Sequence, residues 1–251
     1  MSGKVAALYR YPVKGFTPER LMQADLVAGG FFPCDRLYAV EDGPSGFDPA
    51  APAFVSKMKF TVLARLAQVA RVRTAYDEST AVLSVEADGR PPLQACLAEP
   101  AGRRAAAAWL ATFLGEDARG PLQVVSAPGH RFTDHPQGHV SVINLASVRD
   151  LERRIGRPLD PLRFRANLHV DGWPAWAENE ATGRALQLGG ARVAVFKPIV
   201  RCAATEVDPA TARRDIEVPK ALFDGYGHIL CGIYVSVTEG GRVAEGDAAW
   251  L

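Results

Sequence analysis

An arginine and a cysteine stand side by side at residues 201 and 202, directly after the apolar run 191–200. A thiolate is both a nucleophile and a soft metal ligand. A neighbouring guanidinium favours the ionised thiol and also offers planar hydrogen-bond donors to an anion. Arg201 and Cys202 therefore predict a reactive sulfur beside an anionic group.

Further basic and amide side chains stand where predicted strands begin or end. Lys14 follows one predicted strand in the first half of the chain and Arg36 begins another. Arg165 and Asn167 stand at the start of the strand 168–170. A single lysine or arginine at a strand end is usually a solvated charge. These residues therefore carry weight only in combination.

Several other titratable residues could take part in proton transfer. His130, His135 and His139 lie close together, but the Pro and Gly residues between them indicate a loop rather than a helical zinc motif. Imidazole titrates near neutral pH, so we select His139 as a proton donor at the mouth of the site, with a solvated loop histidine as the alternative. Glu178 and Asp208 could form an acid–base pair, although capping of turns is the favoured role for both.

Composition limits the class of protein. The chain has 251 residues, 48% hydrophobic and 23% charged, which suits one large or two modest globular domains. Its formal net charge of +1 gives no general basic excess for nucleic acid or an acidic membrane. Four cysteines without CxxC spacing signal neither a zinc knuckle nor a disulfide framework. The N-terminus lacks a long apolar stretch, so we expect a soluble cytoplasmic protein.

The hydrophobic pattern predicts a mainly β fold with few helices. Alternating or β-branched runs predict strands at 5–13, 36–41, 68–74, 81–87, 122–126 and 140–145. Two Gly-Gly pairs predict tight hairpins, one at 189–190 between strands 186–188 and 192–196, the other at 240–241 between strands 233–238 and 242–244. Helices are expected at 102–115, at 147–155 with Ser147 as N-cap, and at 219–226. A polar segment at 115–128 divides the chain into domains 1–120 and 121–251.

Taken in order, the motifs resemble the MOSC family, the molybdenum cofactor sulfurase C-terminal domain proteins, preceded by that family's N-terminal β-barrel domain. They span nearly the whole chain. The matching stretches are Tyr11-Pro12-Val13-Lys14, residues 30–42, Arg163-Phe164-Arg165-Ala166-Asn167, Ala175-Trp176-Ala177-Glu178, Arg201-Cys202 with Thr205 and Val207-Asp208-Pro209, and Gly232-Ile233-Tyr234 with Gly246-Asp247. The resemblance implies an α+β, mainly β fold: an N-terminal β-barrel-like domain plus a MOSC β-barrel domain with a few peripheral helices.

The resemblance also implies a molybdenum cofactor (Mo-molybdopterin), as in the mitochondrial amidoxime-reducing component and its bacterial relatives. The cysteine of the Arg-Cys motif ligates molybdenum in those proteins, which implies this role for Cys202. The cofactor's polar contacts would be Lys14, Arg36, Arg165, Asn167 and Arg201, in a cleft between the two domains. Two departures put family contacts in doubt: Gly15 stands where the family often has serine, and the loop 135–139 lacks the family's Asp-Thr-Ser stretch.

The implied function is a molybdenum-dependent oxidoreductase that reduces N-hydroxylated compounds such as amidoximes, hydroxylamines and N-hydroxylated bases. Because the chain has no cysteine cluster for an iron–sulfur centre, a separate electron-transfer protein of cytochrome b5, ferredoxin or flavodoxin type is expected. The alternative is a carrier of molybdenum cofactor or sulfur without turnover of its own. A cysteine-nucleophile hydrolase is disfavoured, since no accompanying His and Asn or Asp motif is recognisable.

Overall fold

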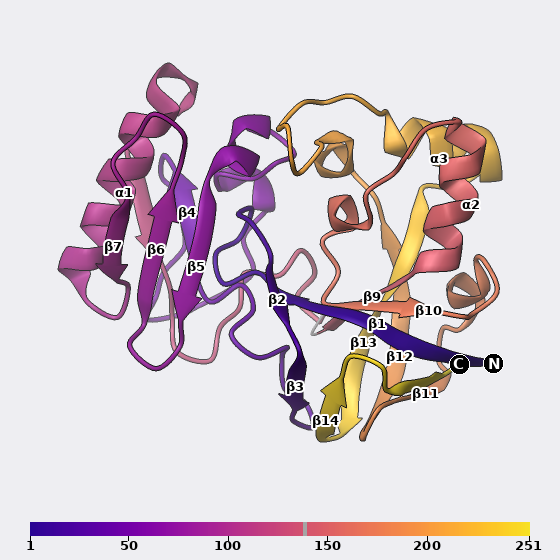
Figure 1. Ribbon diagram of the computed structural model, residues 1–251. Coiled ribbons are helices and arrows are strands. Elements are labelled where there is room, and N and C mark those ends of the chain that lie inside the picture. The colour runs from indigo at the N-terminus through magenta and orange to yellow at the C-terminus, as the bar shows by residue number, and fades with distance from the viewer. Residues whose placement is uncertain (138–139) are drawn as a thin grey trace.

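The computed structural model describes residues 1–137 and 140–251. Within these residues seven strands form a closed barrel (Figure 1). Neighbour by neighbour, and closing on the first, the barrel strands are β1 (Ser2–Arg10), β10 (Leu168–Asp171), β9 (Val140–Asn144), β13 (Leu230–Glu239), β12 (Ala191–Val200), β11 (Ala185–Leu188) and β15 (Ala248–Trp250). The strand β2 (Glu19–Leu21) extends the sheet from β1.

The first strand of the chain completes a barrel made otherwise from the second half. β1 pairs antiparallel with β10, where Val5 lies opposite Val170, and with β15. Val5 and Leu8 are fully buried in the barrel core with Leu168 and other apolar residues of the neighbouring strands. The two termini consequently lie side by side, as Figure 1 shows, and the amide of Leu251 donates to the carbonyl of Met1 at 2.9 Å.

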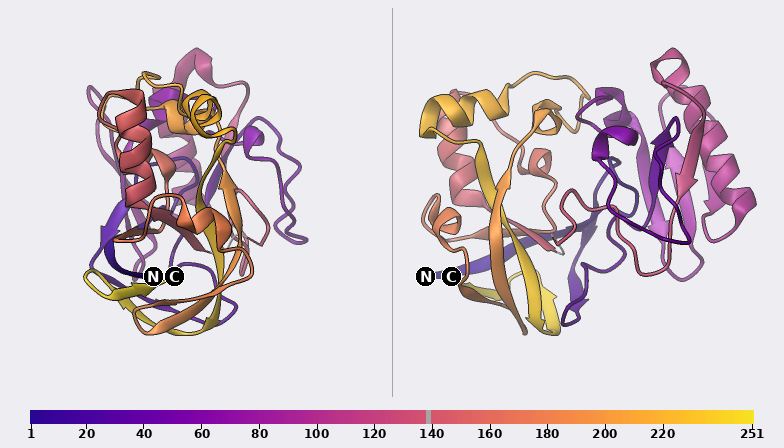
Figure 2. Two further views of the ribbon diagram at one scale, coloured as in Figure 1. Left: turned by 90° about the vertical axis from the view of Figure 1, so that its right-hand side faces the viewer. Right: turned by 180° about the vertical axis from the view of Figure 1, so that it is seen from behind.

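Most of the remaining first half forms a second core at the other end of the molecule (Figure 2), whereas Ala24, Leu26 and Phe32 belong to the barrel core. The elements of the second core are the sheet of β5 (Arg73–Asp77), β6 (Val82–Glu86) and β7 (Leu93–Cys96), the pair β4 (Ala39–Asp42) and β8 (Leu122–Val125), and the helix α1 (Pro100–Leu114). Ala106, Ala107, Leu110 and Leu114 form the buried stripe of α1 at helical spacing. This stripe packs the helix against the sheet.

Two further helices and six 3₁₀ turns occur among the described residues. The helices α2 (Leu145–Ile155) and α3 (Val218–Tyr226) pack against each other beside the barrel (Figure 2). The 3₁₀ turns are η1 (Lys57–Lys59), η2 (Ala67–Arg71), η3 (Gly115–Asp117), η4 (Pro161–Phe164), η5 (Ala177–Glu180) and η6 (Ala203–Glu206). No helix among residues 1–137 and 140–251 has both the length and the apolar character needed to cross a membrane.

The mainly β fold with few helices is confirmed, as is the hairpin at Gly189-Gly190, which joins β11 to β12. The second predicted hairpin is wrong. β14 (Gly241–Ala244) turns away from β13 and pairs with β3 (Gln23–Leu26). This pairing places Gly241 against Gly190, where an added Cβ would lie 2.2 Å from the Gly190 carbonyl oxygen. Gly241 is therefore required for close backbone contact.

Two local predictions also need correction. The predicted strand 68–74 begins as the 3₁₀ turn η2, and extended structure starts only at Arg73. The N-cap of α2 is Asn144 rather than Ser147, because the Asn144 side chain accepts from the amide of Ala146 at 3.0 Å. Ser147 is instead buried within the helix. The division into domains 1–120 and 121–251 stays a prediction, with β1 and β3 pairing across it.

Candidate functional site

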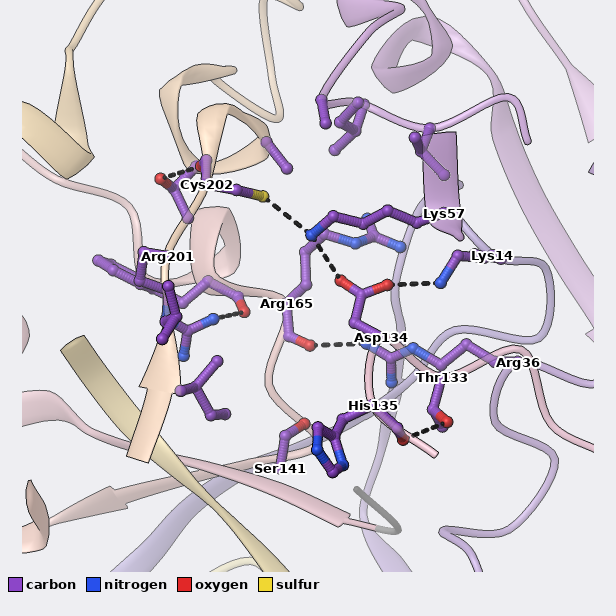
Figure 3. A pocket seen from close by; sticks show the side chains of 18 of the residues that line it. Lys14, Arg36, Lys57, Thr133, Asp134, His135, Ser141, Arg165, Arg201 and Cys202 are labelled. Atoms are coloured by element: carbon purple, nitrogen blue, oxygen red, sulfur yellow. Dashed lines mark hydrogen bonds and ion pairs between the residues drawn. The ribbon is translucent and has the colours of Figure 1, made fainter. Parts of the chain in front are cut away.

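A cavity of about 300 Å³ lies where loops of the first half meet one end of the barrel (Figure 3). This volume is at the lower end of the range for small-molecule and cofactor sites, roughly 300–1,000 Å³. Among the described residues that line it, seven are lysine or arginine and two are aspartate. A chain of net charge +1 therefore concentrates positive charge here.

The structure brings all six predicted cofactor-binding residues together on the wall of this cavity. They are Lys14, Arg36, Arg165, Asn167, Arg201 and Cys202. Gly15 and His135 also line it, whereas His139 lies outside the described residues. The roles of these residues in binding stay predictions, but their convergence from segments far apart in the sequence is a structural fact.

Cys202 projects its sulfur into the cavity from the start of η6 (Figure 3). The turn is secured by Thr205, whose hydroxyl donates to the Cys202 carbonyl at 2.9 Å. The Nζ atom of Lys57 lies 3.2 Å from the Cys202 sulfur. The cation that contacts the sulfur is therefore Lys57, a residue that sequence analysis missed.

Arg201 is oriented differently from the prediction that its guanidinium supports the adjacent thiol. Its Nε donates to the carbonyl of Cys231 at 2.7 Å and its Nη1 to the carbonyl of Phe164 at 2.8 Å. Its Nη2 is buried and has no hydrogen-bond partner among the described residues. Burial lowers the pKa of Arg201. The side chain thus ties β13 to η4 and leaves one donor unsatisfied.

Arg165 and Arg36 both stack on the ring of Tyr11. Their guanidinium carbons lie 4.3 Å and 4.6 Å from the ring centroid, within the range of a cation–π contact. Arg165 has a φ of +53° at the end of η4, a left-handed conformation uncommon for a residue with a side chain. Burial lowers the pKa of Arg165 to about 10, and its Nη2 has no partner among the described residues. Arg36 pairs with Asp35 and donates to the Arg165 carbonyl at 2.9 Å.

A chain of ion pairs crosses the cavity from Lys14 through Asp134 to Lys57 (Figure 3). Lys14 is buried and also donates to the carbonyl of Phe132 at 2.8 Å, while Lys57 lies 3.3 Å from the Asp134 carboxylate. Burial acts to raise the pKa of Asp134, but Lys14 and Lys57 outweigh it and hold that pKa well below its usual value. Burial likewise acts to lower the pKa of Lys57, but Asp134 and Cys202 outweigh it and raise that pKa. Asp134 and Lys57 are therefore charged at neutral pH, whereas burial lowers the pKa of Lys14 despite its pairing with Asp134.

Asn167 has a structural task at the cavity wall. Its Oδ1 accepts from the amide and the hydroxyl of Ser141, at 3.1 Å and 2.8 Å, and its Nδ2 donates to the carbonyl of Tyr9 at 3.2 Å. These bonds join β9, β1 and the segment before β10. One amide hydrogen of Nδ2 remains for a further partner, so a role in cofactor binding stays a prediction.

Two family models together match almost the whole chain. The MOSC N-terminal beta barrel domain matches residues 2–119, and the MOSC domain matches residues 129–249. The chain belongs to the MOSC family. The resemblance predicted from the sequence motifs is thereby confirmed, and MOSC domains are associated with binding of the molybdenum cofactor.

Two solved structures are similar to this MOSC protein, and the first of them supports its fold. The YuaD protein from Bacillus subtilis is 15% identical over 99% of this chain and 94% of its own, with a TM-score of 0.50. YiiM from Geobacillus stearothermophilus is 23% identical over 45% of this chain and 54% of its own, with a TM-score of 0.36. A search of curated proteins finds no match.

Other candidates of the MOSC chain lie away from the cavity wall. Glu178 is buried and accepts from Asn144 and Ser147, each at 2.8 Å, and Asp208 pairs with Arg163 at 3.0 Å. The ring of His130 packs 4.9 Å from that of Phe132. Among the described residues no group of three His, Cys, Asp or Glu side chains could hold a metal ion.

Three charged residues at the cavity escaped sequence analysis: Lys57, Asp134 and Lys197. Lys57 begins the short turn η1 and Asp134 stands in a loop, where charged residues are common and carry no pattern. Lys197 stands before Pro198 in β12, and this pair interrupts the run of apolar residues along the strand. This interruption is the local sequence feature that could have identified Lys197 as a site residue.

Proposed function

We propose that this MOSC protein holds a molybdenum cofactor in the cavity and uses it to reduce N-hydroxylated compounds. The observation that carries the proposal is a pair of buried, unsatisfied guanidinium nitrogens, Arg165 Nη2 and Arg201 Nη2, in the same cavity as the Cys202 sulfur. An unpaired buried donor costs about 1–3 kcal/mol, which an anionic ligand would recover. Thiolate is a ligand for soft, redox-active metals. This donor set fits a metal cofactor that carries a phosphate.

Each group in the cavity then has a distinct task. Cys202 would ligate the metal, while Arg165 and Arg201 would satisfy the anionic part of the cofactor, as charge-assisted bonds to phosphate favour arginine. When bound, the cofactor supplies the redox chemistry that removes oxygen from an N–O bond. Lys57 holds the sulfur in place from the opposite wall, at 3.2 Å. Lys14 anchors the loop of Asp134 through the Phe132 carbonyl, so that both walls keep their spacing.

The reaction consumes protons, and His135 is the described histidine at the cavity. Burial and the nearby Lys197 lower the pKa of His135, which keeps its ring neutral at pH 7. Its Nδ1 accepts from the amide of Gln137 at 3.2 Å, so the neutral ring carries its proton on Nε2. We propose that His135 Nε2 donates a hydrogen bond to the substrate. The role of proton donor, proposed for His139 from the sequence, is kept.

Electrons would come from a separate protein. The four cysteines of the chain are scattered, and the described residues offer no cluster for a second metal centre. We propose a partner of cytochrome b5, ferredoxin or flavodoxin type that delivers electrons at the cavity. Small N-hydroxylated compounds are the proposed substrates, with no role for nucleic acid.

Metal and pterin analysis of the purified protein tests the cofactor. We expect stoichiometric molybdenum in the wild type, its loss in Cys202→Ala, and its retention in Cys96→Ala, a control at a cysteine outside the cavity lining. The double variant Arg165→Met, Arg201→Met should lose pterin as well as metal. Wild-type protein without molybdenum after expression in a host that makes the cofactor would refute the proposal.

Turnover separates the reductase from the alternative, a carrier of cofactor or sulfur. Chemically reduced, molybdenum-loaded protein should convert benzamidoxime to benzamidine, and Cys202→Ala should not. Cofactor bound at full stoichiometry without turnover of benzamidoxime or 6-hydroxylaminopurine would favour the carrier. Reduction that persists in Cys202→Ala would remove Cys202 from the reaction.

A further inference from the structure

We propose that Lys197 selects substrates that carry an anionic group remote from their N–O bond, so that planar N-hydroxylated carboxylates or phosphates bind better than their neutral analogues. The inference rests on the proposed reductase function and extends it to a substrate class. It starts from the charge balance of the cavity, which leaves one half-buried cation without a partner among residues 1–137 and 140–251.

The seven cations of the cavity fall into three groups. Four have carboxylate partners: Lys14 and Lys57 pair with Asp134, Arg36 with Asp35, and Arg163 with Asp208 and Asp215. Arg165 and Arg201 have none, but both are enclosed by protein, with Arg165 stacked on Tyr11 and Arg201 bonded to two carbonyls. Lys197 has neither a hydrogen bond nor an ion pair with any described residue. It is therefore available to a ligand that enters from solvent.

Lys197 lies in a row of polar side chains along the barrel rim. It stands opposite Tyr234 in the pairing of β12 with β13, and Tyr234 stands opposite Ser141 in the pairing of β13 with β9. All three line the cavity. Neighbours opposite each other on paired strands have Cβ atoms roughly 4.5–5.5 Å apart, so the Lys197 side chain starts beside that of Tyr234, and Ser141 lies one strand further on. The ammonium of Lys197 and the phenol of Tyr234 can donate to the oxygens of a carboxylate or phosphate, whereas the Ser141 hydroxyl already donates to Asn167 Oδ1.

An aromatic wall stands next to this row. The ring of His135 lies 6.1 Å from that of Tyr234 and 5.1 Å from that of Phe196, centroid to centroid. Such an arrangement suits the face or edge of a planar ring. A neutral imidazole adds a hydrogen-bond donor without competing with Lys197 for the anion. The chemistry of the wall therefore favours a planar substrate over a flexible aliphatic one.

The Lys197 position is also separate from the buried arginine pair. The last three residues of β12 separate Lys197 from Arg201, which corresponds to at most about 13 Å between their Cα atoms. The cofactor's phosphate has the buried donors of Arg165 and Arg201 to satisfy, whereas a half-buried ammonium is solvated by water without a ligand. The cavity thus offers a buried anion position for the cofactor and an accessible one for substrate.

Paired substrates test this inference. We expect the wild type to prefer 4-carboxybenzamidoxime to benzamidoxime in kcat/KM, and Lys197→Met to reduce that preference about tenfold, the effect of one charge-assisted contact. Lys197→Glu should invert the preference and Lys197→Arg should retain it. 2-Carboxybenzamidoxime, with its charge beside the N–O group, should gain little from Lys197. Lys59→Met is the matched control, since Lys59 does not line the cavity.

A binding measurement separates this inference from the proposed reaction. Titration of loaded protein with 4-carbamoylbenzoate and with benzamide, followed by NMR or calorimetry, should show the same Lys197-dependent preference without turnover. That preference together with no reduction of any amidoxime would refute the reductase and leave the anion position standing. An unchanged preference in Lys197→Met would overturn the inference. Loss of molybdenum in Lys197→Met would overturn it too, because Lys197 would then serve the cofactor.

Discussion

Arg214 joins two loops across the cavity, so its removal should loosen the site without touching the lining cations. Its Nη2 donates to the carbonyls of Leu63 and Ala64, at 2.7 Å and 2.9 Å, and its Nη1 to the carbonyl of Ala203 at 2.6 Å. Leu63 and Ala64 line the cavity from the first half of the chain, and Ala203 directly follows Cys202. The guanidinium therefore fixes the distance between the two walls.

The size of the effect follows from these three bonds. A hydrogen bond from a charged donor contributes about 1.5–3 kcal/mol when buried. The Arg214 side chain is 33% exposed, and water can reach the released carbonyls, so we expect Arg214→Ala to lower the free energy of unfolding by only about 2 kcal/mol in total. Arg213→Ala is the matched control, because Arg213 is exposed and makes no side-chain bond to a described residue. Its cost should stay within about 0.5 kcal/mol.

Urea denaturation measures the global loss, and amide hydrogen exchange locates it. The amide of Thr205, which donates to the Cys202 carbonyl at 3.0 Å, should exchange faster in Arg214→Ala by up to about 30-fold, the factor equivalent to 2 kcal/mol. The exchange rates of amides in the sheet β5–β6–β7 should rise only by the factor that corresponds to the loss of global stability. If Arg214→Ala matches Arg213→Ala in both measurements, the idea that this residue holds the walls together is refuted.

Two further predictions concern stability. His169 is 4% exposed, and burial lowers its pKa to about 4. The neutral ring therefore contributes its full share to the free energy of unfolding above the unfolded pKa near 6.5. This contribution is lost as the pH falls toward 4. In urea unfolding, His169 should lower the free energy of unfolding by about 2.5 kcal/mol between pH 7.5 and pH 4.5, and His169→Phe should lack this decrease. If the free energy of unfolding falls equally with pH in the wild type and in His169→Phe, His169 is not the group responsible. Gly15→Ala should cost at least about 1–3 kcal/mol, because Gly15 has a φ of +92° and its added Cβ would lie 2.4 Å from the Thr61 carbonyl oxygen. Gly29→Ala, at a φ of +69° with open space around it, should cost less in the same assay, and equal losses would show that the Thr61 contact is unimportant.

Local patterns predicted the elements because they are local in origin. The Gly189-Gly190 hairpin and the alternating strands depend on residues a few positions apart, and those predictions held apart from the start of the strand 68–74, which is the turn η2. The partner of β14 depends on residues more than 200 positions away, and the preference of a strand for one neighbour is set by packing on its faces rather than by its own composition. The hairpin expected at Gly240-Gly241 failed for this reason.

The same distinction applies within the cavity. Motif order selected side chains that line one cavity, but it could not say which of them are neutralised by other residues. Asp134 lies 120 positions from Lys14 and 77 from Lys57, so the pairing that neutralises both lysines exists only in the folded chain. It follows that the informative charges are those left without a carboxylate partner, Arg165, Arg201 and Lys197. A net charge of +1 conceals all three, because the carboxylates that balance them in the total lie elsewhere on the molecule.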